Sequence, residues 1–135
     1  MSIKTYHGSC HCKRVTFEAD LDLAKGTGKC NCSFCWKVRN WSMILKPDAL
    51  RPLTGREEMT TYTFGSHQGQ HAFCKHCGAR TYSWGNVPEV GGEFVSINLS
   101  SLDDLDPSEL ADAPVKHMNG RADMWWTAPT ETRHL

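Results

Sequence analysis

Residues 73–78 read Phe73-Cys74-Lys75-His76-Cys77-Gly78, which is a pair of cysteines two residues apart with a glycine directly after it. On a turn after a strand, this spacing lets two sulfurs converge on one metal ion, and the glycine gives the backbone the freedom that such a turn needs. A second close pair, Cys10 and Cys12, lies far earlier in the chain. Together the pairs supply four thiolates, the usual closed set for structural zinc. Because this zinc would join the N-terminal strand to the middle of the sheet, we expect metal binding to contribute directly to folding.

The remaining three of the seven cysteines form a cluster of their own, Cys30, Cys32 and Cys35. Three protein ligands leave the fourth zinc position open to water or substrate, which is the arrangement of catalytic zinc. Zinc also deprotonates a coordinated thiol and makes it a nucleophile at neutral pH. The alternative is a structural site in which a histidine completes the three cysteines as the fourth ligand, and His67 and His71 are the nearest candidates in sequence.

Two redox interpretations of the cysteines remain open. Cys74 and Cys77 could be a thioredoxin-like redox pair, although the βαβ pattern expected around such a pair is missing from the sequence. The whole chain could also be a thiol redox or metal-buffering protein. Its cysteines would then oxidise reversibly without loss of the fold.

A length of 135 residues predicts a single domain, residues 1–135, large enough for a modest core. The N-terminus lacks the apolar run of a signal peptide, and no segment approaches the ~20 apolar residues that span a bilayer. We therefore expect a cytoplasmic protein with reduced thiols and no membrane partner. In that compartment, closely spaced cysteines are more often metal ligands than disulfides.

Net charge is zero, but its distribution along the chain is uneven. Residues 1–46 carry eight Lys and Arg against three Asp and Glu, a balance of +5, whereas residues 47–135 carry seven against twelve, a balance of −5. The basic part contains the three-cysteine cluster, where a positive field would attract a small anionic ligand. A nucleic-acid partner is not expected, because the chain has no long Lys/Arg run and is not basic overall.

The sequence predicts a mainly β fold. Polar and apolar residues alternate, or form short apolar runs, in 14–19, 42–45, 59–64, 80–84 and 93–99, and Val95, Ile97 and Leu99 share one face. One short helix is well marked, with Asp106 as N-cap, Pro107 at the first position and Glu109 at the reciprocal capping-box position.

The cysteine motifs, taken in order, resemble those of a known family. The segments Gly8-Ser9-Cys10-x-Cys12, Cys30-x-Cys32-x-x-Cys35 and Phe73-Cys74-x-x-Cys77-Gly78 look like the glutathione-dependent formaldehyde-activating enzyme family, whose domain is shared with centromere protein V. Residues 92–98 and Asn119-Gly120-Arg121 before Trp125-Trp126 also look like its C-terminal half.

The resemblance implies an Mss4-like β-fold with zinc knuckles and two zinc ions per chain. One is a structural zinc on Cys10, Cys12, Cys74 and Cys77, and the other is a catalytic zinc on Cys30, Cys32 and Cys35. It implies a carbon–sulfur lyase that forms or cleaves S-hydroxymethylglutathione, with glutathione as co-substrate and formaldehyde as the aldehyde. The same kinship permits a rival function, a non-catalytic zinc scaffold for a protein partner, in which a fourth protein ligand would close the second site.

Two positions depart from the family pattern. Asn31 stands where the family usually has His, and Lys13 stands where it usually has Gly. Neither change removes a ligand. Asn31 is expected to alter hydrogen bonding around the catalytic cluster, and Lys13 suggests a different backbone shape in the first turn.

Glutathione carries two carboxylates, which suits the basic bias near the central cluster. Lys37 and Arg39 are the candidates for binding them, with solvated surface charge as the alternative for both.

Overall fold

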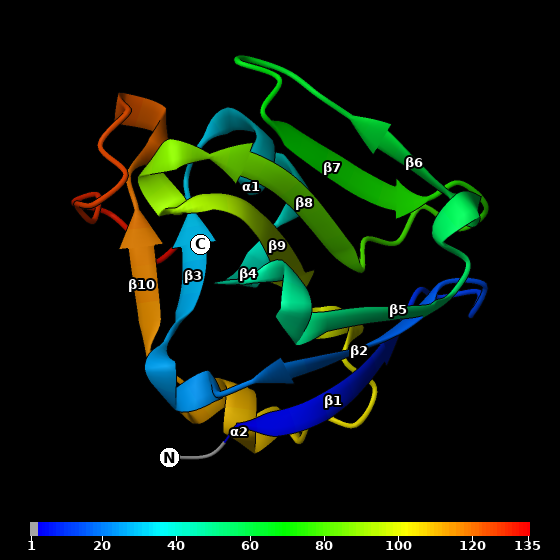
Figure 1. The fold of residues 1–135 in the computed structure, drawn as a ribbon. Coiled ribbons are helices and arrows are strands. Elements are labelled where there is room, and N and C mark those ends of the chain that lie inside the picture. Colours follow the sequence, from blue (N-terminus) through cyan, green and yellow to red (C-terminus); the bar gives the residue numbers. More distant parts are fainter. Residues whose placement is uncertain (1–2) are drawn as a thin grey trace.

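The computed structural model describes residues 3–135, which form two β-sheets and two short α-helices (Figure 1). The smaller sheet has the order β1-β2-β5 and consists of β1 (Lys4–Ser9), β2 (Thr16–Leu21) and β5 (Leu50–Thr54). Both of its strand pairs are antiparallel. The expected mainly β fold is confirmed.

The larger sheet has the order β10-β3-β4-β9-β8-β7-β6. Its strands are β3 (Thr27–Cys30), β4 (Trp41–Leu45), β6 (Met59–Tyr62), β7 (Gly69–Cys74), β8 (Tyr82–Val87), β9 (Gly92–Asn98) and β10 (Val115–Met118). All of its pairs are antiparallel except β10 with β3, which are parallel. The strand order places β3, which leads into the three-cysteine cluster, between β10 and β4 (Figure 1).

All five strand segments predicted from alternation overlap an observed strand, namely β2, β4, β6, β8 and β9, with ends displaced by a few residues. The short strands β3 and β10 show no clear alternation, and β5 contains Pro52, so periodicity did not reveal them. Within residues 3–135, no helix is long and apolar enough to cross a membrane.

The two sheets meet through aromatic side chains. Phe17 of β2 packs edge-on against Tyr82 of β8 with ring centroids 5.4 Å apart, and both are fully buried. Gly8 of β1 makes this approach possible, since a Cβ there would lie 2.3 Å from the Phe17 ring. Val95, Ile97 and Leu99 are buried as their shared face predicts.

The predicted helix is present as α2 (Pro107–Asp112), and the Asp106 side chain accepts a hydrogen bond from the Ser108 N–H at 3.1 Å. The Glu109 carboxylate also interacts with the Asp106 backbone N–H, as its predicted reciprocal capping position requires. In addition it accepts hydrogen bonds from Lys4 Nζ at 3.0 Å and the Tyr6 hydroxyl at 2.9 Å, which connects α2 to β1. A second helix, α1 (Ser33–Val38), was not predicted, because its N-cap is a cysteine.

Candidate metal centres

Four cysteine sulfurs from distant parts of the chain converge at one end of the β1–β2 hairpin. The Sγ atoms of Cys10, Cys12, Cys74 and Cys77 all lie within 4.8 Å of one another. The Cys10–Cys12 and Cys12–Cys74 Sγ distances are both 3.7 Å. A tetrahedral zinc with ~2.3 Å Zn–S bonds requires sulfurs ~3.8 Å apart. The four sulfurs therefore fit a zinc ion.

Backbone N–H groups point at these sulfurs. Val15 N donates to Cys10 Sγ at 3.3 Å, and His76 N donates to Cys74 Sγ at 3.4 Å. Hydrogen bonds from the Ala79 N–H and the Cys12 backbone lower the pKa of Cys77 to about 6. The pKa of Cys12 is also lowered, chiefly by the Arg14 backbone. Since hydrogen-bond donors stabilise the thiolate, the backbone of both turns favours the form of these cysteines that binds a metal ion.

Both turns of this site contain one residue in the left-handed region. Gly78 has φ 77° after the second pair, and Lys13 has φ 70° after the first. Lys13 thus takes a conformation that a glycine adopts most easily. Its ammonium lies 3.0 Å from Ser9 Oγ and 3.5 Å from Asp103.

The second cluster lies where β3 ends and α1 begins. The Sγ atoms of Cys30, Cys32 and Cys35 lie within 4.8 Å of one another. Cys32 is the N-cap of α1, and its sulfur accepts a hydrogen bond from the Cys35 N–H at 3.3 Å, while the Cys32 N–H donates to Cys30 Sγ at 3.3 Å. One tight turn thus gathers all three sulfurs.

The three thiols share protons unequally. Hydrogen bonds from the Cys30 and Cys35 thiols, together with backbone N–H groups at the start of α1, lower the pKa of Cys32 to about 2. The pKa of Cys35 is raised because its proton is shared with those neighbours and because it is buried. The cluster therefore favours at least one thiolate, which is the form that binds a metal ion.

No histidine or carboxylate of residues 3–135 joins these three sulfurs in the same compact group. The ring of His71 lies against Phe34 of α1, with centroids 4.4 Å apart, and burial lowers its pKa. His67 hydrogen-bonds Thr63 at 2.9 Å. Neither histidine is thus placed as the fourth ligand in the described chain.

Asn31, between the first two cysteines of the cluster, is buried and binds the segment after β10. Its Nδ2 donates to Asn119 Oδ1 at 3.0 Å, and its Oδ1 accepts from the Arg121 N–H at 3.0 Å. Gly120 between these partners comes so close that a Cβ there would lie 2.7 Å from Cys30 Sγ. The Asn31 side chain therefore fixes the cysteine turn to residues 119–121.

A small cleft of about 150 Å³ opens beside Cys30 and Cys35. Its other walls are formed by Lys29, Trp36, Arg39, Asn40, Trp41 and Leu135. Sulfur, aromatic rings and two cations thus meet in one place. Such a cleft suits a small thiol or carbonyl compound that carries negative charge.

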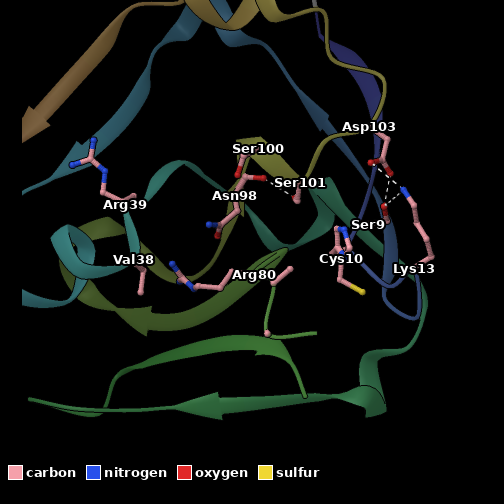
Figure 2. Close-up of a pocket in the computed structure, with 13 residues that line it drawn as sticks. Ser9, Cys10, Lys13, Val38, Arg39, Arg80, Asn98, Ser100, Ser101 and Asp103 are labelled. Carbon is pink, nitrogen blue, oxygen red and sulfur yellow. Dashed lines mark hydrogen bonds and ion pairs between the residues drawn. The ribbon is translucent and has the colours of Figure 1, made fainter. Parts of the chain in front are cut away.

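A larger and more open cleft of about 660 Å³ extends from Cys10 and Lys13 to Val38 and Arg39 (Figure 2). It touches Cys10 and none of the three sulfurs of the second cluster. Its link to that cluster is Arg80, which donates to Asn40 Oδ1 at 3.1 Å, while Asn40 Nδ2 points at Cys35 Sγ from 3.9 Å. Burial lowers the pKa of Arg80. The larger cleft is polar, whereas Cys30 and Cys35 line the smaller one.

The two cations chosen from the sequence differ in position. Arg39 lies on the walls of both clefts, whereas Lys37 lines neither of them. The structure adds Lys29, whose ammonium lies 4.2 Å above the Trp41 ring on the wall of the small cleft. Its position next to Cys30 was the signal in the sequence that could have identified it.

Two comparisons with known proteins agree with this arrangement. The sequence model of the family described as glutathione-dependent formaldehyde-activating enzyme matches residues 5–126. A crystal structure of a Rhodobacter sphaeroides protein superposes with a TM-score of 0.69 at 29% sequence identity, covering 82% of this chain and 99% of the other. The match spans both cysteine clusters, and the chain therefore belongs to the glutathione-dependent formaldehyde-activating enzyme family.

Proposed function

We propose that this single-domain protein is a zinc-dependent carbon–sulfur lyase, which forms or cleaves the adduct of a small thiol with a small aldehyde. The observation that carries the proposal is the three-sulfur cluster beside a cleft, with no fourth protein ligand among residues 3–135. Family membership supports glutathione as the thiol and formaldehyde as the aldehyde.

The two cysteine clusters have different roles in this proposal. Cys10, Cys12, Cys74 and Cys77 hold a structural zinc, and Cys30, Cys32 and Cys35 hold the catalytic one. When bound at the second cluster, zinc supplies Lewis acidity, which favours the thiolate of the substrate or polarises the aldehyde oxygen. Thiolate ligands must stay reduced, which suits the cytoplasm.

In the synthetic direction, the thiol sulfur bonds to the aldehyde carbon, the carbonyl π bond breaks, and the thiol proton ends on the new hydroxyl oxygen. The protein aligns the reactants for this step. Trp36 and Trp41 line the cleft and restrict water, and the charged Arg39 favours an anionic thiol. Asn31 holds the cysteine turn against residues 119–121.

A non-catalytic scaffold would close the second site with a fourth ligand. Within the described residues the compact group contains three sulfurs only, and His67 and His71 make other contacts. This favours the enzyme over the scaffold.

The test is zinc content and glutathione binding in the wild type and in Cys32→Ala. We expect two zinc ions per chain to fall to about one, with the fold kept and both glutathione binding and S-hydroxymethylglutathione formation lost. Ser33→Ala, an exposed neighbour in the same turn, is the matched control and should behave as wild type. Unchanged glutathione binding in Cys32→Ala, or its global unfolding, would overturn the lyase assignment.

A further inference from the structure

Segment 131–135 lies across the small cleft beside Cys30 and Cys35. The main-chain oxygen of Leu135 accepts a hydrogen bond from Lys29 Nζ at 3.2 Å, and that of His134 accepts one from Arg39 Nη1 at 2.6 Å. The His134 ring also packs against Trp36, with centroids 4.8 Å apart. Figure 1 places the end of the chain beside β3, in agreement with these contacts.

Both cations lie beside the small cleft that Cys30 and Cys35 line. Lys29 directly precedes Cys30, and its ammonium lies over Trp41, whose indole N–H is anchored on Thr27 Oγ1 at 2.8 Å. Arg39 closes α1 in the left-handed conformation with φ 55°. Neither makes an ion pair with an acidic side chain in the described part of the chain. Their only acceptors among the described contacts are main-chain oxygens of segment 131–135.

The free space in the cleft is small. Pockets that enclose a drug-sized molecule measure roughly 300–1,000 Å³, whereas this cleft measures about 150 Å³ with segment 131–135 in place. The cleft has room for a small aldehyde. A peptide-sized thiol needs the space that Leu135, on the wall of the cleft, now takes.

We propose that Lys29 and Arg39 form the carboxylate subsite for the thiol substrate, and that segment 131–135 occupies this subsite in the free protein. The inference rests on the proposed function, because it names the part of the thiol that the site recognises. The His134 oxygen that Arg39 contacts is a neutral peptide oxygen, and a carboxylate forms stronger hydrogen bonds with a guanidinium group than such an oxygen does. A thiol with a carboxylate can therefore displace the segment, and binding requires the segment to leave.

The first experiment measures glutathione binding to the zinc-loaded protein by calorimetry, with and without residues 131–135. When a competent state is only partly populated, the apparent affinity falls by that fraction. Deletion of the segment should therefore tighten glutathione binding about tenfold. The two hydrogen bonds described above, together with the Trp36 contact, connect the segment to the rest of the described chain, so its loss should leave the core intact.

The second experiment asks whether Lys29 recognises the carboxylate. In Lys29→Met, which keeps the apolar stem over Trp41, glutathione binding should weaken about tenfold, while binding of cysteamine, a thiol without a carboxylate, should stay within twofold. Lys116→Met on the neighbouring strand β10 is the matched control, because Lys116 is exposed and does not line the cleft. Lys37→Met tests the other lysine chosen from the sequence and should leave both affinities unchanged.

A third measurement uses the intact chain. If the segment leaves when the thiol binds, saturating glutathione should accelerate tryptic cleavage after Arg133, and cysteamine should not.

The outcomes separate the two proposals. If neither glutathione nor cysteamine binds any variant, the proposed lyase function is wrong, and the proposed subsite, which depends on it, is wrong as well. If glutathione binds and Cys32→Ala abolishes the binding, but neither the deletion nor Lys29→Met changes the affinity, the function stands and the subsite is wrong. Equal weakening of glutathione and cysteamine in Lys29→Met would show a structural role for Lys29 and would also overturn the subsite.

Discussion

The two cysteine clusters are made of the same ligand type but differ in what surrounds them. The four-cysteine cluster takes two residues from each of two distant turns, and Cys10 and Cys74 in it are 1% exposed. The three-cysteine cluster takes all its sulfurs from one local turn at the start of α1 and faces a cleft. The two clusters therefore differ in two ways. The four-cysteine cluster connects distant parts of the chain and offers a full set of ligands, whereas the three-cysteine cluster is local and leaves one side toward the cleft.

The largest difference in stability between variants of the two clusters is expected from Cys74→Ser. Structural zinc in small domains contributes roughly 10–16 kcal/mol of binding free energy, which is comparable with the whole stability of a domain, about 5–15 kcal/mol. Loss of one of the four ligands that join β1 to β7 should abolish the cooperative fold at 25 °C. Circular dichroism and zinc analysis measure this.

Cys32→Ala is the matched comparison for that variant, because it removes a thiol from the local cluster. Its unfolding transition should remain cooperative. If Cys74→Ser stays folded with one zinc fewer, the contrast between a structural and a local cluster is lost.

An intermediate effect is expected at Asn31. Asn31→Ala leaves the Arg121 N–H without its partner and leaves Asn119 Oδ1 with only the 3.4 Å hydrogen bond from the Ala122 N–H, a loss of about 1–3 kcal/mol in the free energy of unfolding. Zinc affinity of the three-cysteine site should fall about 10–100-fold, because groups that orient metal ligands have effects of that size. Competition with a chromophoric chelator measures the affinity.

Two controls sharpen the Asn31 result. Asn31→Asp keeps the acceptor for Arg121 but loses the donor to Asn119, so it should lie between wild type and Asn31→Ala. Asn86→Ala, at an exposed position of β8, should leave both zinc affinities unchanged. An equal loss of zinc affinity at both clusters in Asn31→Ala would contradict a local role.

The smallest effects are expected within the four-cysteine site, at its two left-handed residues. Lys13→Gly should stabilise the fold by about 0.5 kcal/mol, because glycine adopts φ 70° without the strain of a side chain. Gly78→Ala should destabilise it by about 1 kcal/mol for the opposite reason, since a Cβ there meets no atom within 4 Å and only the backbone strain remains. Urea midpoints of the zinc-loaded proteins measure both changes. The same sign for both substitutions would show that the turns do not share this conformation.

The sequence predicted the mainly β fold, the helix at Pro107 and the division of seven cysteines into groups of four and three, and the structure agrees with all of these. Alternation and cysteine spacing are local signals, so a single sequence carries them. Helix α1 was missed because the thiol of Cys32 caps it, and cysteine is not among the usual N-cap residues.

The chain itself determined which residues can bind metal, because thiol chemistry and short spacings between cysteines do not depend on the rest of the fold. Only the tertiary structure decided what surrounds them. It brought Cys10 and Cys12 to Cys74 and Cys77, placed Asn31 on Asn119, and laid segment 131–135 across Lys29 and Arg39. These contacts join residues separated by about sixty to a hundred positions, and no local pattern encodes them, because they form only when distant parts of the chain pack together.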